Sequence, residues 1–111
     1  MEPLLILTNL PDVASAEKLA HALIERRAAA CVNVLAACRS IYRWRGAVEA
    51  ADEIPLLIKT TAANYPLVEE IIRAQHPYDV PELIALPITH GLPAYLDWLA
   101  TETEKHDQEQ E

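Results

Sequence analysis

Residues 31–61 read CVNVLAACRSIYRWRGAVEAADEIPLLIKTT, a pattern that predicts a long β-hairpin. The first half of Cys31–Arg45 is mostly apolar, and its second half alternates between polar and apolar side chains. This is typical of a strand that starts inside a sheet and continues as a protruding ribbon. Gly46 marks the turn, and Val48–Thr61 returns as the second strand. Pro55 cannot donate a ladder hydrogen bond, so it predicts an edge or a bulge in the return strand.

The segments on either side of this hairpin alternate between strand and helix patterns. They are a strand at Leu4–Thr8, a helix at Val13–Arg27 with Asp12 as N-cap, a helix at Asn64–Gln75, a strand at Glu82–Ile88 and a final helix at Ala94–Glu102. The order β-α-β-β-α-β predicts an α+β fold, the ferredoxin-like sandwich, with an extra C-terminal helix. We expect one domain over residues 1–102 and an acidic C-terminal tail over residues 103–111.

The two hairpin strands are longer than a sheet of this size needs. Strands of about 14 residues would extend roughly 45 Å, well beyond the usual strand length. Either they bend, or their ends pair with another subunit. Because Tyr42 and Trp44 lie on the exposed part of the ribbon, we expect self-association that covers this edge.

Charge and hydropathy exclude several classes of partner. The chain of 111 residues carries 17 acidic and 9 basic side chains, a net charge of −8. A general nucleic-acid footprint needs a basic excess, so we expect no nucleic-acid partner. No segment reaches the roughly 18 apolar residues that span a membrane, and the N-terminal residues lack signal-peptide features. We therefore expect a cytoplasmic protein with no membrane partner and with reduced cysteines.

The basic residues of the hairpin alternate with its aromatic residues. Arg39, Arg43 and Arg45 share one face of a regular strand, opposite Tyr42 and Trp44. We expect these arginines to pair with Glu49 or Glu53 across the hairpin, or with another subunit.

Motifs of common enzyme classes are missing from the sequence. It contains no G-x-S-x-G, no H-E-x-x-H, no phosphate-binding Gly-rich loop and no C-x-x-C. We therefore expect no enzymatic reaction.

Seven short motifs follow the predicted elements in order. They are PD (11–12), AAACVN (28–33), SIYRWRG (40–46), KTT (59–61), HPYDVPE (76–82), PITHG (87–91) and YLDWL (95–99). Together they resemble the CutA divalent-cation tolerance family over nearly the whole chain. The resemblance implies a ferredoxin-like homotrimer whose hairpin strands pair across subunits. It also implies a cytoplasmic role in tolerance of copper and other divalent metals, with no established reaction.

Two alternatives to metal tolerance remain open. The implied trimer resembles the PII signalling proteins, which bind small effectors in clefts between subunits, but a shared fold does not transmit function. A purely structural assembly protein is the other alternative.

His76 is the candidate metal ligand, because imidazole commonly binds copper and zinc and two prolines make its loop rigid. In some family members a copper site is proposed from two adjacent histidines and a cysteine. Gln75 and Thr8 stand at two of these positions here, so the resemblance implies only a weakly bound copper or other divalent ion. Asp79 and Glu82 would supply further donors. The alternative is a loop histidine without a metal.

Two other sets of residues are candidate sites, one for a metal ion and one for a small ligand. Cys31 and Cys38 are seven residues apart, on opposite faces of a regular strand, so they cannot share one ion unless a bulge intervenes. Buried, inert thiols are the simpler interpretation. In the trimer that the resemblance implies, a cleft between subunits would be lined by Trp44, Lys59, Tyr78 and Glu82. There Lys59 would attract an anionic effector, or would form an ion pair with Glu82.

Overall fold

The computed structural model describes residues 1–104, so most of the predicted tail, from 105 to 111, lies outside the described residues. The elements in chain order are β1 (Pro3–Leu10), α1 (Val13–Glu25), β2 (Cys31–Val34), β3 (Cys38–Trp44), β4 (Ala47–Thr61), a 3-10 turn (Ala62–Asn64), α2 (Tyr65–Gln75), β5 (Ile84–Pro87) and α3 (Pro93–Glu102). Among these described residues, no helix is long and apolar enough to cross a membrane.

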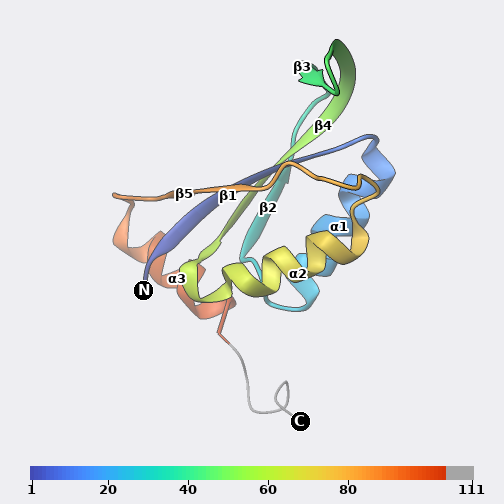
Figure 1. The fold of residues 1–111 in the computed structure, drawn as a ribbon. Coiled ribbons are helices and arrows are strands. Elements are labelled where there is room, and N and C mark those ends of the chain that lie inside the picture. Colours follow the sequence, from blue (N-terminus) through green and yellow to red (C-terminus); the bar gives the residue numbers. More distant parts are fainter. Residues whose placement is uncertain (105–111) are drawn as a thin grey trace.

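The main sheet has the strand order β2-β4-β1-β5, and every neighbouring pair is antiparallel (Figure 1). Two β-α-β units are interleaved in it, since β4 lies between β1 and β2, and β1 lies between β4 and β5. The predicted ferredoxin-like α+β fold is confirmed.

Helix α1 begins and ends through local hydrogen bonds. The carboxylate of Asp12 accepts a bond of 2.8 Å from the Ser15 N–H, which confirms the predicted N-cap. The helix ends two residues before the expected Arg27, because Arg27 adopts a left-handed φ of 56°. That conformation turns the chain so that the Ala28 N–H bonds to the Leu23 carbonyl at 2.9 Å.

The core lies between the sheet and the helices α1 and α2. Strand side chains alternate, so Ile6 and Leu10 of β1 and Leu56 and Ile58 of β4 point to the same face. All four are at most 1% exposed and pack against apolar side chains of both helices. Thr60 is also fully buried on this face, where its hydroxyl donates to the Ala28 carbonyl at 2.6 Å.

The opposite face of the sheet is largely uncovered. Ile84 and Leu86 of β5 are 50% and 46% exposed, and their partners Leu7 and Leu5 in β1 lie on this same face. Helix α3 contacts β4 and β1 at one end of this face, where the centre of the Tyr95 ring lies 5.9 Å from the Lys59 Nζ. An apolar strip of sheet therefore remains open in the single chain.

The prediction of one continuous strand over Cys31–Arg45 is wrong, because β2 ends at Val34 and β3 begins at Cys38. Val34 pairs with Leu56 and Cys38 pairs with Glu53. The chain therefore advances four residues from β2 to β3 while β4 advances three. This extra residue is a bulge in the segment between Val34 and Cys38, opposite Pro55, and not in the return strand where it was expected. The Leu35 N–H donates to the Pro55 carbonyl at 3.0 Å, but proline has no N–H for the return bond.

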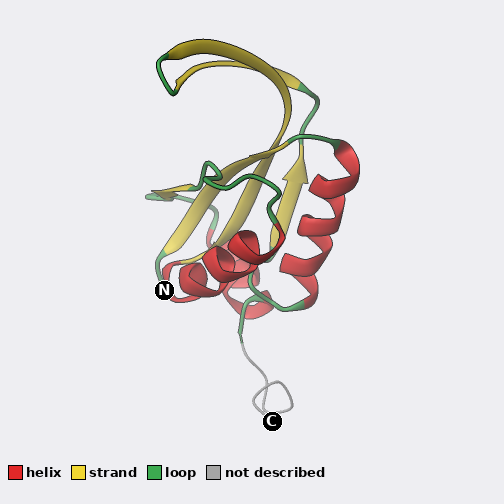
Figure 2. Cartoon of the chain, turned by 45° about the vertical axis from the view of Figure 1, so that its right-hand side comes forward, coloured by secondary structure: helices red, strands yellow, loops and turns green. Residues whose placement is uncertain are grey.

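Beyond the bulge, β3 and the first half of β4 curl away from the main sheet (Figure 2). We call residues 38–53 the curled hairpin. Its strands meet in a two-residue turn at Arg45 and Gly46, whose φ angles of 50° and 84° suit a twisted hairpin. The overlong strands therefore bend, which was one of the two expected solutions. Strand β5 is shorter than predicted, beginning at Ile84 and not at Glu82.

The fold also includes the first residue of the predicted tail. Thr103 is 4% exposed, its hydroxyl donates to the Leu99 carbonyl at 2.9 Å, and its carbonyl accepts from the Asn64 amide at 3.2 Å.

We predict that Thr60→Val lowers the free energy of unfolding by about 1–3 kcal/mol, since the buried Ala28 carbonyl loses its donor. Thr60→Ser keeps the donor and removes only a methyl group, so its cost should stay at about 1 kcal/mol. Chemical denaturation at one fixed protein concentration measures both. A valine variant as stable as the serine variant would contradict the role given to this hydrogen bond.

Candidate functional site

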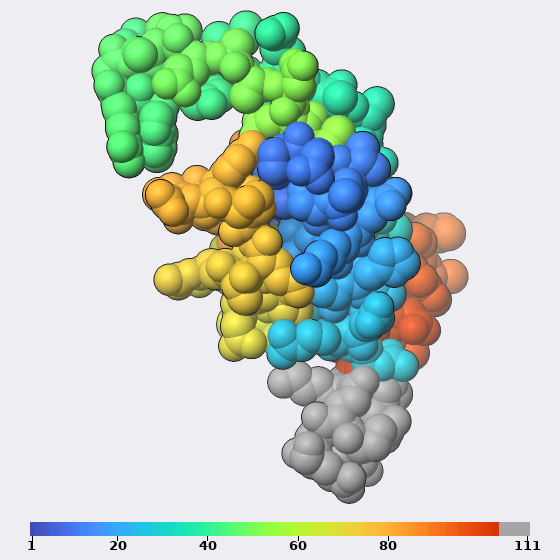
Figure 3. Space-filling view, turned by 90° about the vertical axis from the view of Figure 1, so that its right-hand side faces the viewer, coloured from blue at the N-terminus to red at the C-terminus, as the bar shows by residue number. Residues whose placement is uncertain are grey.

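A cavity of about 680 Å³ lies between the curled hairpin and the loop that follows α2. Figure 3 shows the hairpin arching over that loop, residues 76–82, with a hollow between them. The cavity is lined by Asn9, Ser40, Ile41, Tyr42, Trp44, Arg45, Glu49, Glu53, Tyr78, Asp79, Val80 and Glu82. We call it the hairpin cavity.

Three of the four predicted cleft residues, Trp44, Tyr78 and Glu82, share this cavity. The fourth, Lys59, does not line it, because it lies on the open face of the main sheet beside Tyr95. Among residues 1–104, Lys59 and Glu82 form no ion pair within the chain. The aromatic wall and the lysine are therefore separate features of one subunit.

His76 does not line the cavity but contacts two residues that do, Asn9 and Tyr78; it is 8% exposed and has both ring nitrogens in hydrogen bonds. Its Nδ1 accepts from the Tyr78 N–H at 3.2 Å, so Nε2 carries the proton and donates to the Asn9 carbonyl at 2.6 Å. A metal ligand needs a free nitrogen lone pair, and this arrangement leaves none. Within residues 1–104, no cluster of three or more His, Cys, Asp or Glu side chains is placed to hold a metal ion.

The end of β1 holds the far end of the same loop. The Thr8 hydroxyl donates to the Glu82 carbonyl at 2.7 Å, and the Asn9 amide donates to the Glu82 carboxylate at 2.8 Å. Thr8 is 1% exposed, so its bond is protected from water. Together with His76, these contacts fix residues 76–82 against β1 and set the floor of the cavity.

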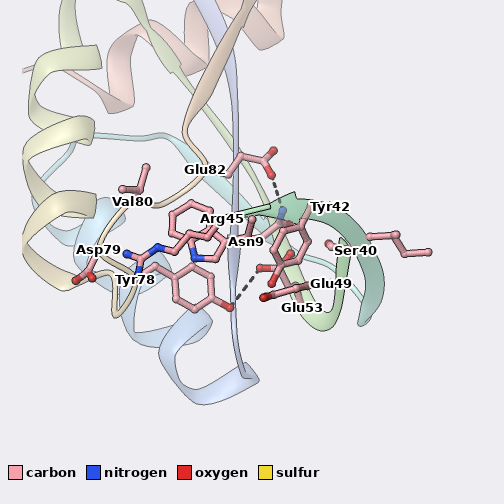
Figure 4. A pocket seen from close by; sticks show the side chains of 12 residues that line it. Asn9, Ser40, Tyr42, Arg45, Glu49, Glu53, Tyr78, Asp79, Val80 and Glu82 are labelled. Atoms are coloured by element: carbon pink, nitrogen blue, oxygen red, sulfur yellow. Dashed lines mark hydrogen bonds between the residues drawn. The ribbon is translucent and has the colours of Figure 1, made fainter. Parts of the chain in front are cut away.

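Glu53 and Tyr78 meet across the cavity wall. The Tyr78 hydroxyl donates to the Glu53 carboxylate at 3.3 Å (Figure 4), and Glu53 is only 9% exposed. Burial raises the pKa of Tyr78 above its usual value, and the charge of Glu53 and this hydrogen bond raise it further. The phenol is therefore held in its neutral, donating form.

Sequence reasoning missed Glu53 and Glu49 as site residues. Both are on the cavity side of β4, where Cys38 and Tyr42 pair with them. The signal was their spacing of four, which places them on one face of a strand. What hid it was the curl of the hairpin, which brings that face over the loop.

The arginine pairing expected across the hairpin is wrong for Arg39 and Arg43. Their cross-strand partners are Asp52 and Val48, so they lie on the face away from Glu49 and Glu53. Among the described residues, neither arginine forms an ion pair.

The bulge places Cys31 and Cys38 on the same side of β4. Their partners there, Lys59 and Glu53, are six residues apart. At about 3.3 Å per residue that is about 20 Å, too far to share one ion. Cys31 is half-buried and Cys38 is exposed, so the expectation of buried thiols is wrong for Cys38.

Comparison with known proteins identifies the family. A family model described as CutA1 divalent ion tolerance protein matches residues 4–102. The chain belongs to this family. The divalent-cation tolerance protein CutA of Thermus thermophilus is 47% identical over 98 residues, covering 88% of this chain and 95% of that protein. The predicted resemblance to CutA is confirmed.

Solved CutA1 structures share the fold. The divalent cation tolerance protein (Cut A1) from Thermus thermophilus superposes with a TM-score of 0.90 at 45% identity, covering 92% of this chain and 99% of that one. CutA1 from Oryza sativa gives 0.91 at 36% identity, covering 96% and 97%. The CutA1 family is named for tolerance of divalent ions and not for a reaction.

In this CutA1 chain, we predict that Glu53→Gln lowers the pKa of Tyr78 toward its ordinary value, because the neighbouring negative charge is removed. The raised pKa favours folding below about pH 10 and this contribution is lost as pH rises through the folded-state value, so the variant loses part of it. Ultraviolet titration at alkaline pH, with Tyr78→Phe subtracted in each background, isolates this phenol. Glu17→Gln, an equal charge change on the exposed face of α1, should leave it unmoved. An unchanged pKa in Glu53→Gln would contradict the contact.

Proposed function

We propose that the chain acts as a cytoplasmic homotrimer in divalent-cation tolerance, binds copper or another divalent ion weakly, and catalyses no reaction. The family match over residues 4–102 carries this proposal. Residues 1–102 serve as its single domain.

Strand edges and an open sheet face support the trimer. Strand β3 pairs only with β4, and β5 pairs only with β1, so each has one free edge among the described residues. Free edges tend to pair with other chains. A contact of β3 in one subunit with β5 in the next is heterologous, and three such contacts close a ring. The same ring covers the apolar strip that includes Leu5, Leu7, Ile84 and Leu86.

His76 is the proposed ligand for the ion. Binding there breaks its hydrogen bond to the Asn9 carbonyl or to the Tyr78 amide, since both nitrogens are in use. That cost, together with the absence of a preformed three-ligand cluster among residues 1–104, accounts for weak binding.

A second function, the binding of a small effector, is favoured by the hairpin cavity. Its volume of about 680 Å³ lies within the usual range for small-molecule sites, and polar groups converge on an aromatic wall.

We predict that His76→Gln abolishes specific copper binding while the trimer persists. Glutamine keeps a donor for the Asn9 carbonyl and replaces the imidazole by a weaker copper ligand. Native mass spectrometry of the full chain with added Cu(II) counts ions per trimer. His21→Ala, on the exposed face of α1, is the matched control and should bind as the unchanged protein does. Equal copper uptake in both variants would remove His76 from the metal site.

We predict that Leu86→Lys dissociates the trimer, because it places a charge on the apolar strip that the ring covers. The control is Ile24→Lys on α1, where a side chain with similar exposure, 41% against 46%, lies away from this strip. Light scattering after size exclusion gives the mass of each. A trimer that survives Leu86→Lys, or one that Ile24→Lys disrupts equally, would argue against this interface.

A further inference from the structure

The hairpin cavity is acidic and its charges are not balanced. Glu49, Glu53, Asp79 and Glu82 line it against one cation, Arg45. Within the described part of the chain, none of the four carboxylates forms an ion pair. The anionic effector expected beside Lys59 does not suit this cavity, because Lys59 lies elsewhere.

Among the four carboxylates, Glu53 has the greatest unmet need for a cation or for hydrogen-bond donors. It is 9% exposed, and the Tyr78 hydroxyl, 3.3 Å away, is its only hydrogen-bond donor among residues 1–104. A carboxylate has about four acceptor positions, and burying one is costly unless a cation or several donors face it. The open side of Glu53 is the cavity itself. A cationic guest with N–H donors would supply what the chain does not.

The aromatic wall suits the same guest. Tyr42, Trp44 and Tyr78 are 38–41% exposed, so part of each ring is open. The guanidinium of Arg45 already lies 5.3 Å from the centre of the Trp44 ring. The wall thus holds one cation from its own chain, by the attraction between positive charge and an aromatic face.

The spacing of the carboxylates selects an elongated ligand. Glu49 and Glu53 are on one face of β4 and four residues apart, which is about 13 Å along a strand. No cluster of three or more His, Cys, Asp or Glu side chains among the described residues is placed to hold a metal ion. A ligand whose positive charges are joined by apolar segments therefore fits a site whose carboxylates are separated by aromatic rings.

We propose that the hairpin cavity binds a linear aliphatic polyamine, with ammonium groups directed to Glu53 and Glu49 and methylene segments against Tyr42 and Trp44. This names a ligand class for the second function proposed above, and it does not depend on the metal site.

Titration calorimetry of the full chain with spermidine tests the proposal. We expect saturable binding with one stoichiometry per chain, weakened at least tenfold by Glu53→Gln and by Trp44→Leu. Glu17→Gln removes an equal charge outside the cavity and should change the affinity less than twofold. An α,ω-diol of similar length, which lacks charge, should not bind. Mg²⁺ at equal charge concentration should not displace spermidine.

Other outcomes overturn the proposal. Equal weakening by Glu17→Gln, or displacement by Mg²⁺, would mean general charge attraction. No binding by a chain that light scattering shows to be trimeric would mean that a neighbouring subunit fills the cavity, and the trimer would stand while this inference fails. A monomer that binds spermidine as expected would instead overturn the trimer alone.

Discussion

The missing N–H of Pro55 is the constraint on which the curled hairpin and the cavity beneath it depend. Pro55 lies in β4 between Asn9 of β1 and the start of the bulge, and it accepts from Leu35 without returning a bond. The ladder between the two long strands therefore breaks and restarts with its register moved by one residue. Because the restarted part turns away from the main sheet, the hairpin arches over residues 76–82 and a cavity exists there.

Much of the fold could be predicted from short-range patterns. The apolar runs predicted the strands β1 and β4, but Leu5 and Leu57 on the open face are as apolar as Ile6 and Ile58 on the covered one, so the pattern alone does not distinguish the two faces. The N-cap at Asp12 and the turn at Gly46 are set by neighbours in the sequence. Pro55 indicated an edge or a bulge in the return strand, and the bulge lies opposite it, between Val34 and Cys38. The direction of the curl could not be predicted, because it depends on the combined twist of two strands after the break.

The site was only partly predictable for a related reason. The sequence pointed to Trp44, Tyr78 and Glu82 through a family resemblance, and the structure brings these three together. It could not place Lys59 apart from them, because Lys59 shares a face of β4 with Glu53 and is separated from it by six residues along the strand. Nor could it show that His76 bonds through both nitrogens, because Asn9 is 67 positions away in the chain. Long-range pairing of this kind leaves no local pattern.

The curl has a consequence for how copies of this chain add to one another. A chain with unlike free strand edges, such as those of β3 and β5, is able to grow by repeated addition, as a fibre does. Growth stops only where each added copy is rotated enough for the last to meet the first. In the trimer proposed above, β3 is carried on the arched hairpin and β5 on the flat sheet, so the arch would set that rotation. Flattening it would then turn a closing contact into a propagating one.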